Sequence, residues 1–274
     1  MAHDQEVHDH DRGLSHDLPT LLSRRRALAL FGGAGLAAAL AGCGITGSND
    51  NSGTSPSASS AAATASAGTE IPEETAGPYP GDGSNGVNVL TESGIVRSDI
   101  TRSFGSASGV AQGVPLAINL KVLDTSNGSG GMQGAAVYLW HCNIDGKYSL
   151  YSEGITRENY LRGVQETGSD GSVTFTSIYP AAYSGRWPHI HFEVYPSLEA
   201  ATTASGKLRT SQLALPEAAC KLVYATDGYS QSLQNMAQTS LDTDNVFSDG
   251  YSLQLATVTG NVPDGMTASL NVPV

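Results

Sequence analysis

Residues 116–122 read Leu-Ala-Ile-Asn-Leu-Lys-Val, in which large apolar side chains alternate with small or polar ones. Side chains of a β-strand point in turn to the two faces of its sheet, so the four large apolar residues share one face. This stretch therefore predicts a strand that is half buried, with one face against a core.

Several further stretches have the character of short strands and are separated by turn-forming residues. The expected strands are 135–142, 172–178, 189–195, 212–215 and 252–259, with turns at 126–131, 143–146 and 169–171. One short helix is expected around 230–238. Short strands at this spacing predict an all-β fold, an antiparallel β-sandwich with long loops and at most one or two short helices.

The composition narrows the class of protein before any motif is considered. The 274 residues are 39% hydrophobic but only 15% charged, with 32 glycines, which suits an all-β secreted domain. The formal net charge is −12, and no basic cluster is visible, so nucleic-acid binding is excluded as a function. Three cysteines are too few for a disulfide scaffold.

The N-terminal part of the chain has the features of an export signal. Arg24, Arg25 and Arg26 precede an apolar run, 27–41, of about 15 residues, which is shorter than a membrane-spanning helix. The arginines resemble a twin-arginine signal, and Leu-Ala-Gly-Cys at 40–43 resembles a bacterial lipobox. We therefore expect a signal at 1–42, lipidation of Cys43, a flexible linker at 43–68 and a catalytic domain at 69–274. The expected location is the extracellular face of the bacterial cell membrane, or the medium if the protein is secreted.

Beyond the leader the chain keeps only three histidines, and two of them are one residue apart, in His189-Ile190-His191. Residues i and i+2 of a strand share a face, so both imidazoles point the same way, as in many metal sites. A pair of solvated or hydrogen-bonded histidines is the alternative. Three histidines are too few for a Cu/Zn superoxide dismutase site, and Glu193 is too near for a cupin site. A site of two histidines and one carboxylate for Fe(II) stays open.

Five further stretches carry the most specific signal of the chain: residues 140–148, 161–163, 170–175, 178–183 and 186–192. Taken in order, they resemble the core of the intradiol ring-cleavage dioxygenases, the family of protocatechuate and catechol dioxygenases. Upstream, Glu-Thr-Ala-Gly-Pro-Tyr at 74–79 resembles the Gly-Pro-Tyr segment of the family. The resemblance extends from about Glu74 to Leu215, which is most of the expected domain.

This resemblance implies a non-haem Fe(III) ion and the roles of several residues. The implied ligands are Tyr148, Tyr183, His189 and His191. Tyr183 is also the implied base for a substrate proton, Arg186 corresponds to an arginine beside the substrate ring, and Gln212 to a glutamine near it. Tyr79 and Trp187 are the expected flat surfaces for an aromatic ring. Two phenolates and a hydroxide would balance the charge of Fe(III), so a buried site would be neutral.

The implied activity is that of an oxidoreductase. It cleaves a catechol-type ring between the two hydroxylated carbons and incorporates both atoms of O2 into a muconate-type product. The expected partners are a small aromatic substrate and O2, without nucleic acid, and with membrane contact only through the lipid on Cys43. Two alternatives stay open: a non-catalytic, transthyretin-like β-sandwich that binds sugars or proteins, and a Zn or Fe(II) enzyme that uses His189, His191 and a carboxylate. Cys142 and Cys220 are left as either a disulfide or two buried thiols.

Overall fold

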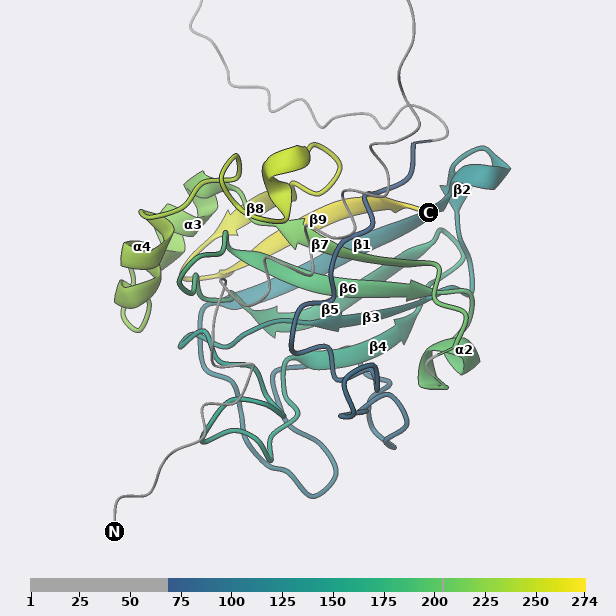
Figure 1. Ribbon diagram of the computed structural model, residues 1–274, viewed down its shortest axis with the longest axis horizontal. Helices are drawn as coiled ribbons and strands as arrows, with labels where there is room; N and C mark the ends of the chain where they lie inside the picture. The colour runs from purple at the N-terminus through teal and green to yellow at the C-terminus, as the bar shows by residue number, and fades with distance from the viewer. Residues whose placement is uncertain (1–68, 204) are drawn as a thin grey trace, which may run out of the picture. The chain divides into compact units, whose positions relative to one another are not determined.

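The computed structural model describes residues 69–203 and 205–274, which form two packed β-sheets (Figure 1). One sheet contains β1 (Pro115–Asp124), β2 (Gly130–Gly131), β5 (Ser172–Ile178), β8 (Thr257–Asn261) and β9 (Gly265–Pro273), in the order β2-β1-β9-β8 with β5 paired to β1. The other contains β3 (Ala136–Trp140), β4 (Arg162–Glu166), β6 (His189–Tyr195) and β7 (Arg209–Ala214), in the order β4-β3-β6-β7. The predicted β-sandwich is confirmed.

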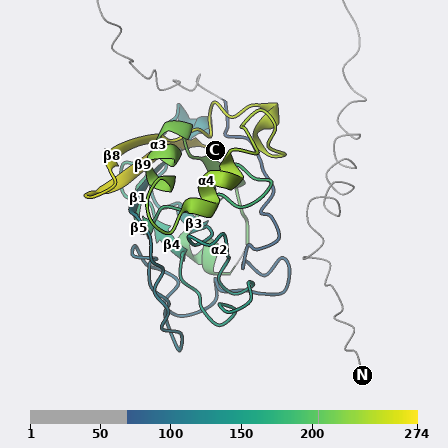
Figure 2. The same cartoon turned by 90° about the vertical axis from the view of Figure 1, so that its left-hand side faces the viewer.

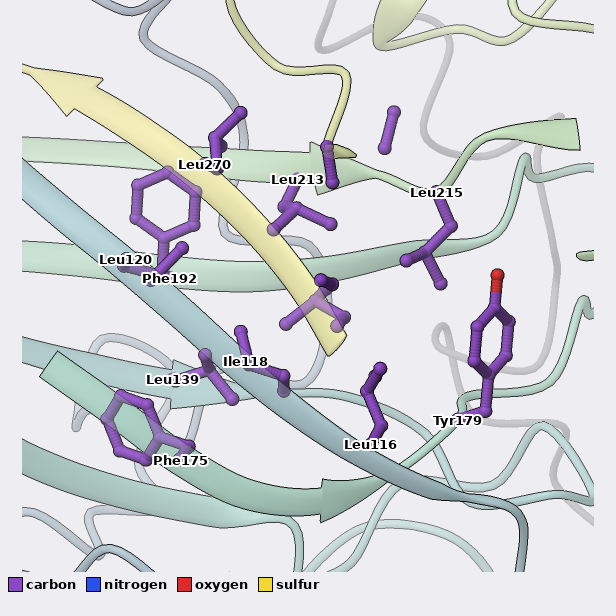
Figure 3. Packing of buried hydrophobic residues seen from close by; sticks show 14 of the residues in the cluster. Leu116, Ile118, Leu120, Leu139, Phe175, Tyr179, Phe192, Leu213, Leu215 and Leu270 are labelled. Carbon is purple, nitrogen blue, oxygen red and sulfur yellow. The ribbon is translucent and has the colours of Figure 1, made fainter. Parts of the chain in front are cut away.

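The alternation that predicted the first strand fixes the position of β1 in the sandwich. Leu116, Ile118, Leu120 and Val122 are each at most 1% exposed and point between the two sheets. There they meet side chains of the opposite sheet, among them Leu139, Phe192 and Leu213 (Figure 3). We call this set of buried side chains the sandwich core, and its burial supplies most of the driving force for folding.

One strand pair departs from the predicted antiparallel arrangement. β1 and β9 run parallel, with Leu116 opposite Met266 at one end and Leu123 opposite Pro273 at the other. No strand was predicted at 265–273, and the preceding strand was predicted too early, at 252–259. The chain turns at 251–255, where the amides of Gln254 and Leu255 both donate to the carbonyl of Tyr251, and β8 starts only at Thr257.

The helices are more numerous than the one or two expected. Three short α-helices occur in the described residues, α2 (Leu198–Thr202), α3 (Glu217–Tyr224) and α4 (Ser230–Met236), besides the 3-10 turns η2 (Thr125–Asn127) and η3 (Phe247–Asp249). The helix predicted at 230–238 is α4. Helix α3 follows Pro216, is stabilised by a Glu217–Lys221 pair and packs on α4 at one end of the sandwich (Figure 2). None of the helices in this described part is long and apolar enough to cross a membrane.

The four-stranded sheet is buried on both of its faces. On β3, Val137 and Leu139 point into the sandwich core, whereas Tyr138 and Trp140 point outward and are also fully buried. The outward side chains belong to a second group, which we call the outer cluster; its members include Val89, Leu90, Ile95, Tyr138, Trp140, Cys142, Tyr148, Val164 and Tyr195. An antiparallel sheet with two buried faces needs a cover on its outer side.

That cover is the segment before the first strand, which crosses the four strands in their spatial order (Figure 1). The Glu74 amide donates to the Thr210 carbonyl on β7, and Gly77 lies against His191 on β6. Further along, the Pro80 carbonyl accepts from Tyr138 Oη on β3, and Val96 forms a β-bridge with Val164 on β4. We call residues 69–100 the cover segment.

Candidate metal centre

Strand β6 places two imidazoles under the cover segment. His189 and His191 point outward, whereas Ile190 and Phe192 point into the sandwich core, as the two-residue period of a strand requires. The outward histidines are 2% and 3% exposed. In the register of the sheet, His191 lies between Trp140 on β3 and Gln212 on β7.

Two loops bring the tyrosines to the same place. Tyr148 follows a turn in which Asn143 Oδ1 accepts from the amides of Asp145 and Lys147. Tyr183 lies in the loop after β5. The loops touch at Gly146, where a Cβ atom would lie only 3.0 Å from the Cβ of Tyr183, and where φ is +75°. Glycine at this position therefore permits both the turn and the close approach.

The polar ends of the four predicted ligand side chains converge. Tyr148 Oη lies 3.5 Å from Tyr183 Oη, and Tyr183 Oη lies 3.0 Å from His189 Nε2. His189 Nε2 lies 3.2 Å from His191 Nε2. We call these four atoms the donor cluster. Tyr148 is 2% exposed and Tyr183 is half-buried beside the exposed Ser184 and Gly185, so the cluster is most open on the Tyr183 side.

Burial sets the protonation of the cluster when no cation is bound. It raises the pKa of the Tyr148 phenol well above its usual value, with a further contribution from Tyr183, and it raises the pKa of Tyr183 to about 12. It lowers the pKa values of His189 and His191 well below the usual range, and nearby positive charge lowers them further. At neutral pH the protein alone therefore holds two neutral phenols and two neutral imidazoles.

Each imidazole is oriented in a different way. His189 Nδ1 bonds the Trp187 carbonyl, so this nitrogen carries the proton and the lone pair of Nε2 faces the donor cluster. His191 Nδ1 is buried without a hydrogen-bond partner. The His191 ring is instead stacked on Trp140, with ring centroids 4.9 Å apart and planes at 7°. On its other side, a Cβ on Gly77 would lie 3.3 Å from His191 Cε1.

The donor cluster fits a single transition-metal ion. Nitrogen and oxygen donors bind such an ion at about 2.0–2.2 Å, so neighbouring donors on one ion lie about 3 Å apart. The three separations in the cluster are 3.0, 3.2 and 3.5 Å. Imidazole suits iron, and tyrosinate is an established iron ligand. In 69–203 and 205–274, no group of three His, Cys, Asp or Glu side chains is placed to hold a metal ion.

Arg186 and Gln212, both predicted near the substrate, contact one another. Arg186 Nη2 donates to Gln212 Oε1 at 2.7 Å, and Arg186 Nη1 lies 3.5 Å from His189 Nε2. Gln212 Nε2 donates to the carbonyl of Thr75, and the Gln212 side chain is fully buried. Gln212 thus supports Arg186 and ties it to the cover segment, while the guanidinium borders the donor cluster.

The two predicted aromatic surfaces lie in different places. Tyr79 is half-buried, and its ring centroid is 5.0 Å from that of Tyr148, so it borders the donor cluster. Trp187 belongs to the sandwich core, and its Nε1 donates to the Leu215 carbonyl. Trp187 and Met236 are among the residues that line a cavity of about 450 Å³. No residue of the donor cluster lines this cavity. Trp187 contacts a residue of the donor cluster through its backbone carbonyl, which bonds His189 Nδ1, and its indole packs in the sandwich core.

The sequence left open whether Cys142 and Cys220 form a disulfide. Cys142 and Cys220 are both buried and both free. Cys142 Sγ contacts the Ala181 carbonyl at 3.6 Å, and Cys220 Sγ contacts Tyr179 Oη at 3.2 Å. The predicted signal at 1–42, the lipidated Cys43 and the linker at 43–68 lie outside the described residues.

One residue of this region, Asp244, was not predicted from the sequence. It is buried and forms an ion pair with Arg186 at 2.9 Å. It lies in a loop 58 positions after Arg186, outside the strands and motifs, so no periodicity or spacing pointed to it. A buried acidic side chain in a loop is recognised only when its partner is known.

Comparison with known proteins shows which sequences and folds this chain resembles. Residues 92–204 match the family model described as dioxygenase. The solved structure of an intradiol ring-cleavage dioxygenase from Tetranychus urticae has a TM-score of 0.58 at 24% identity, covering 75% of this chain and 94% of that one, and so shares the fold. Chlorocatechol 1,2-dioxygenase of Rhodococcus opacus is 40% identical over 50 residues, a match that spans 18% of this chain and 20% of that protein.

The matched region contains Tyr148, Tyr183, His189 and His191. Over 75% of its length, the chain has the fold of the intradiol ring-cleavage dioxygenase from Tetranychus urticae.

Proposed function

We propose that this protein is an Fe(III)-dependent dioxygenase that cleaves catechol-type rings between the two hydroxylated carbons, using O2. The observation that carries the proposal is the convergence of two phenol oxygens and two imidazole nitrogens at 3.0–3.5 Å. The match of residues 92–204 to the dioxygenase family model and the fold shared with a solved intradiol ring-cleavage dioxygenase support the reaction class. Both points weigh against a non-catalytic binding module, which has no use for four buried metal donors.

Tyr148, Tyr183, His189 and His191 would hold the ion. Bound there, Fe(III) supplies a centre that stabilises the tyrosinates and the deprotonated catechol and makes the ring reactive towards O2. Without a cation the two phenols stay protonated, because burial raises both of their pKa values. Loading the site is therefore coupled to release of the phenol protons.

The remaining roles follow from the surroundings of the donor cluster. Tyr183 Oη is on the more open side, so it is placed to accept a proton from a substrate hydroxyl. Arg186 borders His189 and carries a fixed positive charge, which suits stabilisation of negative charge on the ring and oxygen atoms during attack. Tyr79 offers an aromatic face beside Tyr148 for the substrate ring.

Oxygen uptake tests the proposal directly. The iron-loaded protein should consume one O2 per ring with catechol, protocatechuate or hydroxyquinol, and product absorbance should identify a muconate-type dicarboxylate. Tyr183→Phe should abolish the uptake. Tyr229→Phe removes a buried phenol of the sandwich core, away from the donor cluster, and should keep the uptake. A protein that binds iron in full but shows no uptake with any of these substrates would contradict the proposal.

The proposed location outside the cytoplasm depends on the sequence of the leader alone. Arg24–Arg26, the apolar run at 27–41 and Cys43 together support export followed by lipid anchoring. Cell fractionation tests this: the wild-type protein should be found with the membrane, and Cys43→Ser should lose the anchor. Recovery of the wild-type protein in the cytoplasm would contradict export.

A further inference from the structure

The Arg186 guanidinium is nearly buried, and each of its three nitrogens has a distinct neighbour. Nε donates to Asp244 Oδ2 at 2.9 Å, and Nη2 donates to Gln212 Oε1 at 2.7 Å. Nη1 is left facing His189 Nε2 at 3.5 Å. The planar guanidinium has no freedom to rotate while the first two contacts are made, so they determine which edge faces the donor cluster.

Asp244 is itself held rigidly. Its Oδ2 accepts from Arg186 Nε and from the Trp187 amide at 2.7 Å. Its Oδ1 accepts from the amides of Val246 at 2.9 Å and Phe247 at 3.3 Å. The carboxylate is only 1% exposed, and both oxygens are used twice. A carboxylate with four donors in these positions cannot turn without losing hydrogen bonds.

The pair is also an electrostatic unit. A buried guanidinium without a counter-ion is costly, and truncating one partner of a buried ion pair leaves the other charge uncompensated. Gln212 is neutral, so Asp244 is the carboxylate that forms an ion pair with Arg186. Without it, the guanidinium would gain by moving towards water or towards another acceptor.

We propose that Asp244 is a positioning residue for the ring-cleavage site: its carboxylate fixes Arg186 so that Nη1 faces the donor cluster. Asp244 does not touch the donor cluster itself and acts through Arg186. This assigns a role to the loop that precedes η3, a region outside the matched family residues 92–204. The effect on turnover rests on the proposed function, whereas the effect on the position of Arg186 does not.

A crystal structure of Asp244→Asn provides a readout independent of activity. The amide nitrogen must face either Arg186 Nε and the Trp187 amide or the amides of Val246 and Phe247, so two accepted hydrogen bonds and the charge are lost. We expect the Arg186 guanidinium to leave its position in the variant. Asp82→Asn, which changes another buried aspartate, should leave Arg186 in place. An unmoved Arg186 in Asp244→Asn would overturn the proposal even if the protein cleaves no ring.

A double-mutant cycle then tests the route of the effect. Asp244→Asn should lower kcat by about 10- to 100-fold, because displacements of about 1 Å in a positioned group have effects of this size, and should change KM less than about threefold. In an Arg186→Gln background, the same substitution should change kcat less than about twofold. Equal factors in both backgrounds would show that Asp244 acts on folding or by another route.

A third variant keeps the test usable if Asp244→Asn does not fold. Asp244→Glu retains the charge but pushes the guanidinium by one methylene, so kcat should still fall by about tenfold or more. An unchanged kcat in Asp244→Glu would overturn the proposal.

Discussion

Strand β6 presents Ile190, Phe192 and Val194 to the sandwich core, and His189, His191 and Glu193 to the outer cluster. None of these six side chains is more than 3% exposed. The inner three need only apolar neighbours. Each outer group has a specific arrangement instead: Glu193 accepts from Lys207 and from Tyr195 Oη, both at 2.7 Å, and the histidines join the donor cluster.

The difference shows what each face contributes. Apolar burial stabilises the protein in proportion to the area removed from water, without a particular geometry. Buried polar groups give little net stability and are costly when left unpaired, so their arrangement indicates a use. We expect substitutions on the inner face to change stability and substitutions on the outer face to change metal binding and activity.

The largest effect should come from the outer face, in His191→Gln. Loss of a ligand should lower activity by more than the about 10- to 100-fold typical of residues that only support a ligand. His141→Gln is the matched control, because His141 is also buried but bonds Ser177 Oγ and the Cys142 carbonyl outside the donor cluster. Iron content and oxygen uptake check both variants; equal iron in both would count against the donor cluster.

The largest effect on stability should come from the inner face, in Phe192→Ala. The ring is fully buried in the sandwich core, so the free energy of unfolding should fall by about 3–5 kcal/mol. The folded fraction should still bind iron. Urea unfolding measures the change, and a loss below about 1 kcal/mol would show that the core is not closely packed at this position.

Gly77→Ala sharpens the comparison where the cover segment meets β6. Gly77 has φ +71°, and an added Cβ would press on His191; Gly105 has φ +68°, with no atom near an added Cβ. Both alanine variants should lose about 1–2 kcal/mol from the left-handed backbone. Only Gly77→Ala should also lower iron affinity, by about tenfold. Iron titration of the two variants side by side is the check, and equal affinities would mean that His191 is not confined by the cover segment.

The smallest effect should be a change of stability with pH that comes from Glu74 in the cover segment and not from the apolar core. Burial, followed by the negative charge of Asp249, raises the pKa of Glu74 to about 7. The carboxyl is therefore neutral in the folded protein at pH values where it is already charged in the unfolded chain. Its contribution is fully present below about pH 4.5 and is lost as pH rises to about 7, so stability falls over this range.

Glu74→Gln should remove this fall of stability with rising pH. Between pH 5 and pH 8, the free energy of unfolding of the wild type should fall by about 1 kcal/mol more than that of the variant. A shift of one pKa unit corresponds to about 1.4 kcal/mol, and the partial exposure of Glu74 reduces this contribution. Urea unfolding of both proteins at pH 5 and pH 8 measures it. Identical pH dependence of the two proteins would show that Glu74 titrates normally.

The inner face was the more predictable of the two. The alternation at 116–122 and 189–195 follows from the apolar side chains that face the sandwich core, and the structure confirms both strands. Strands β4 and β9 were missed. β4 reads Arg-Gly-Val-Gln-Glu, with a single large apolar residue and therefore no alternation, and its edge pairs with the cover segment through the bridge between Val96 and Val164. Helix α3 was missed because its apolar face is defined only by packing against the end of the sandwich.

The outer face was predicted through motifs and not through periodicity. The resemblance supplied Tyr148 and Tyr183, whose loops converge only in three dimensions. Trp187 was expected to offer a flat surface to the substrate ring, whereas its indole packs in the sandwich core. Asp244 was not predicted at all, since an ion pair across 58 positions leaves no local pattern.

The visible absorption spectrum of the iron-loaded protein tests the central claim most directly. If Tyr148 and Tyr183 bind Fe(III) together with His189 and His191, charge transfer from tyrosinate to Fe(III) should colour the protein red-brown. The band should weaken in each single Tyr→Phe variant and vanish in the double variant. A stoichiometric, active iron protein without this band, or with the band intact in the double variant, would contradict the account.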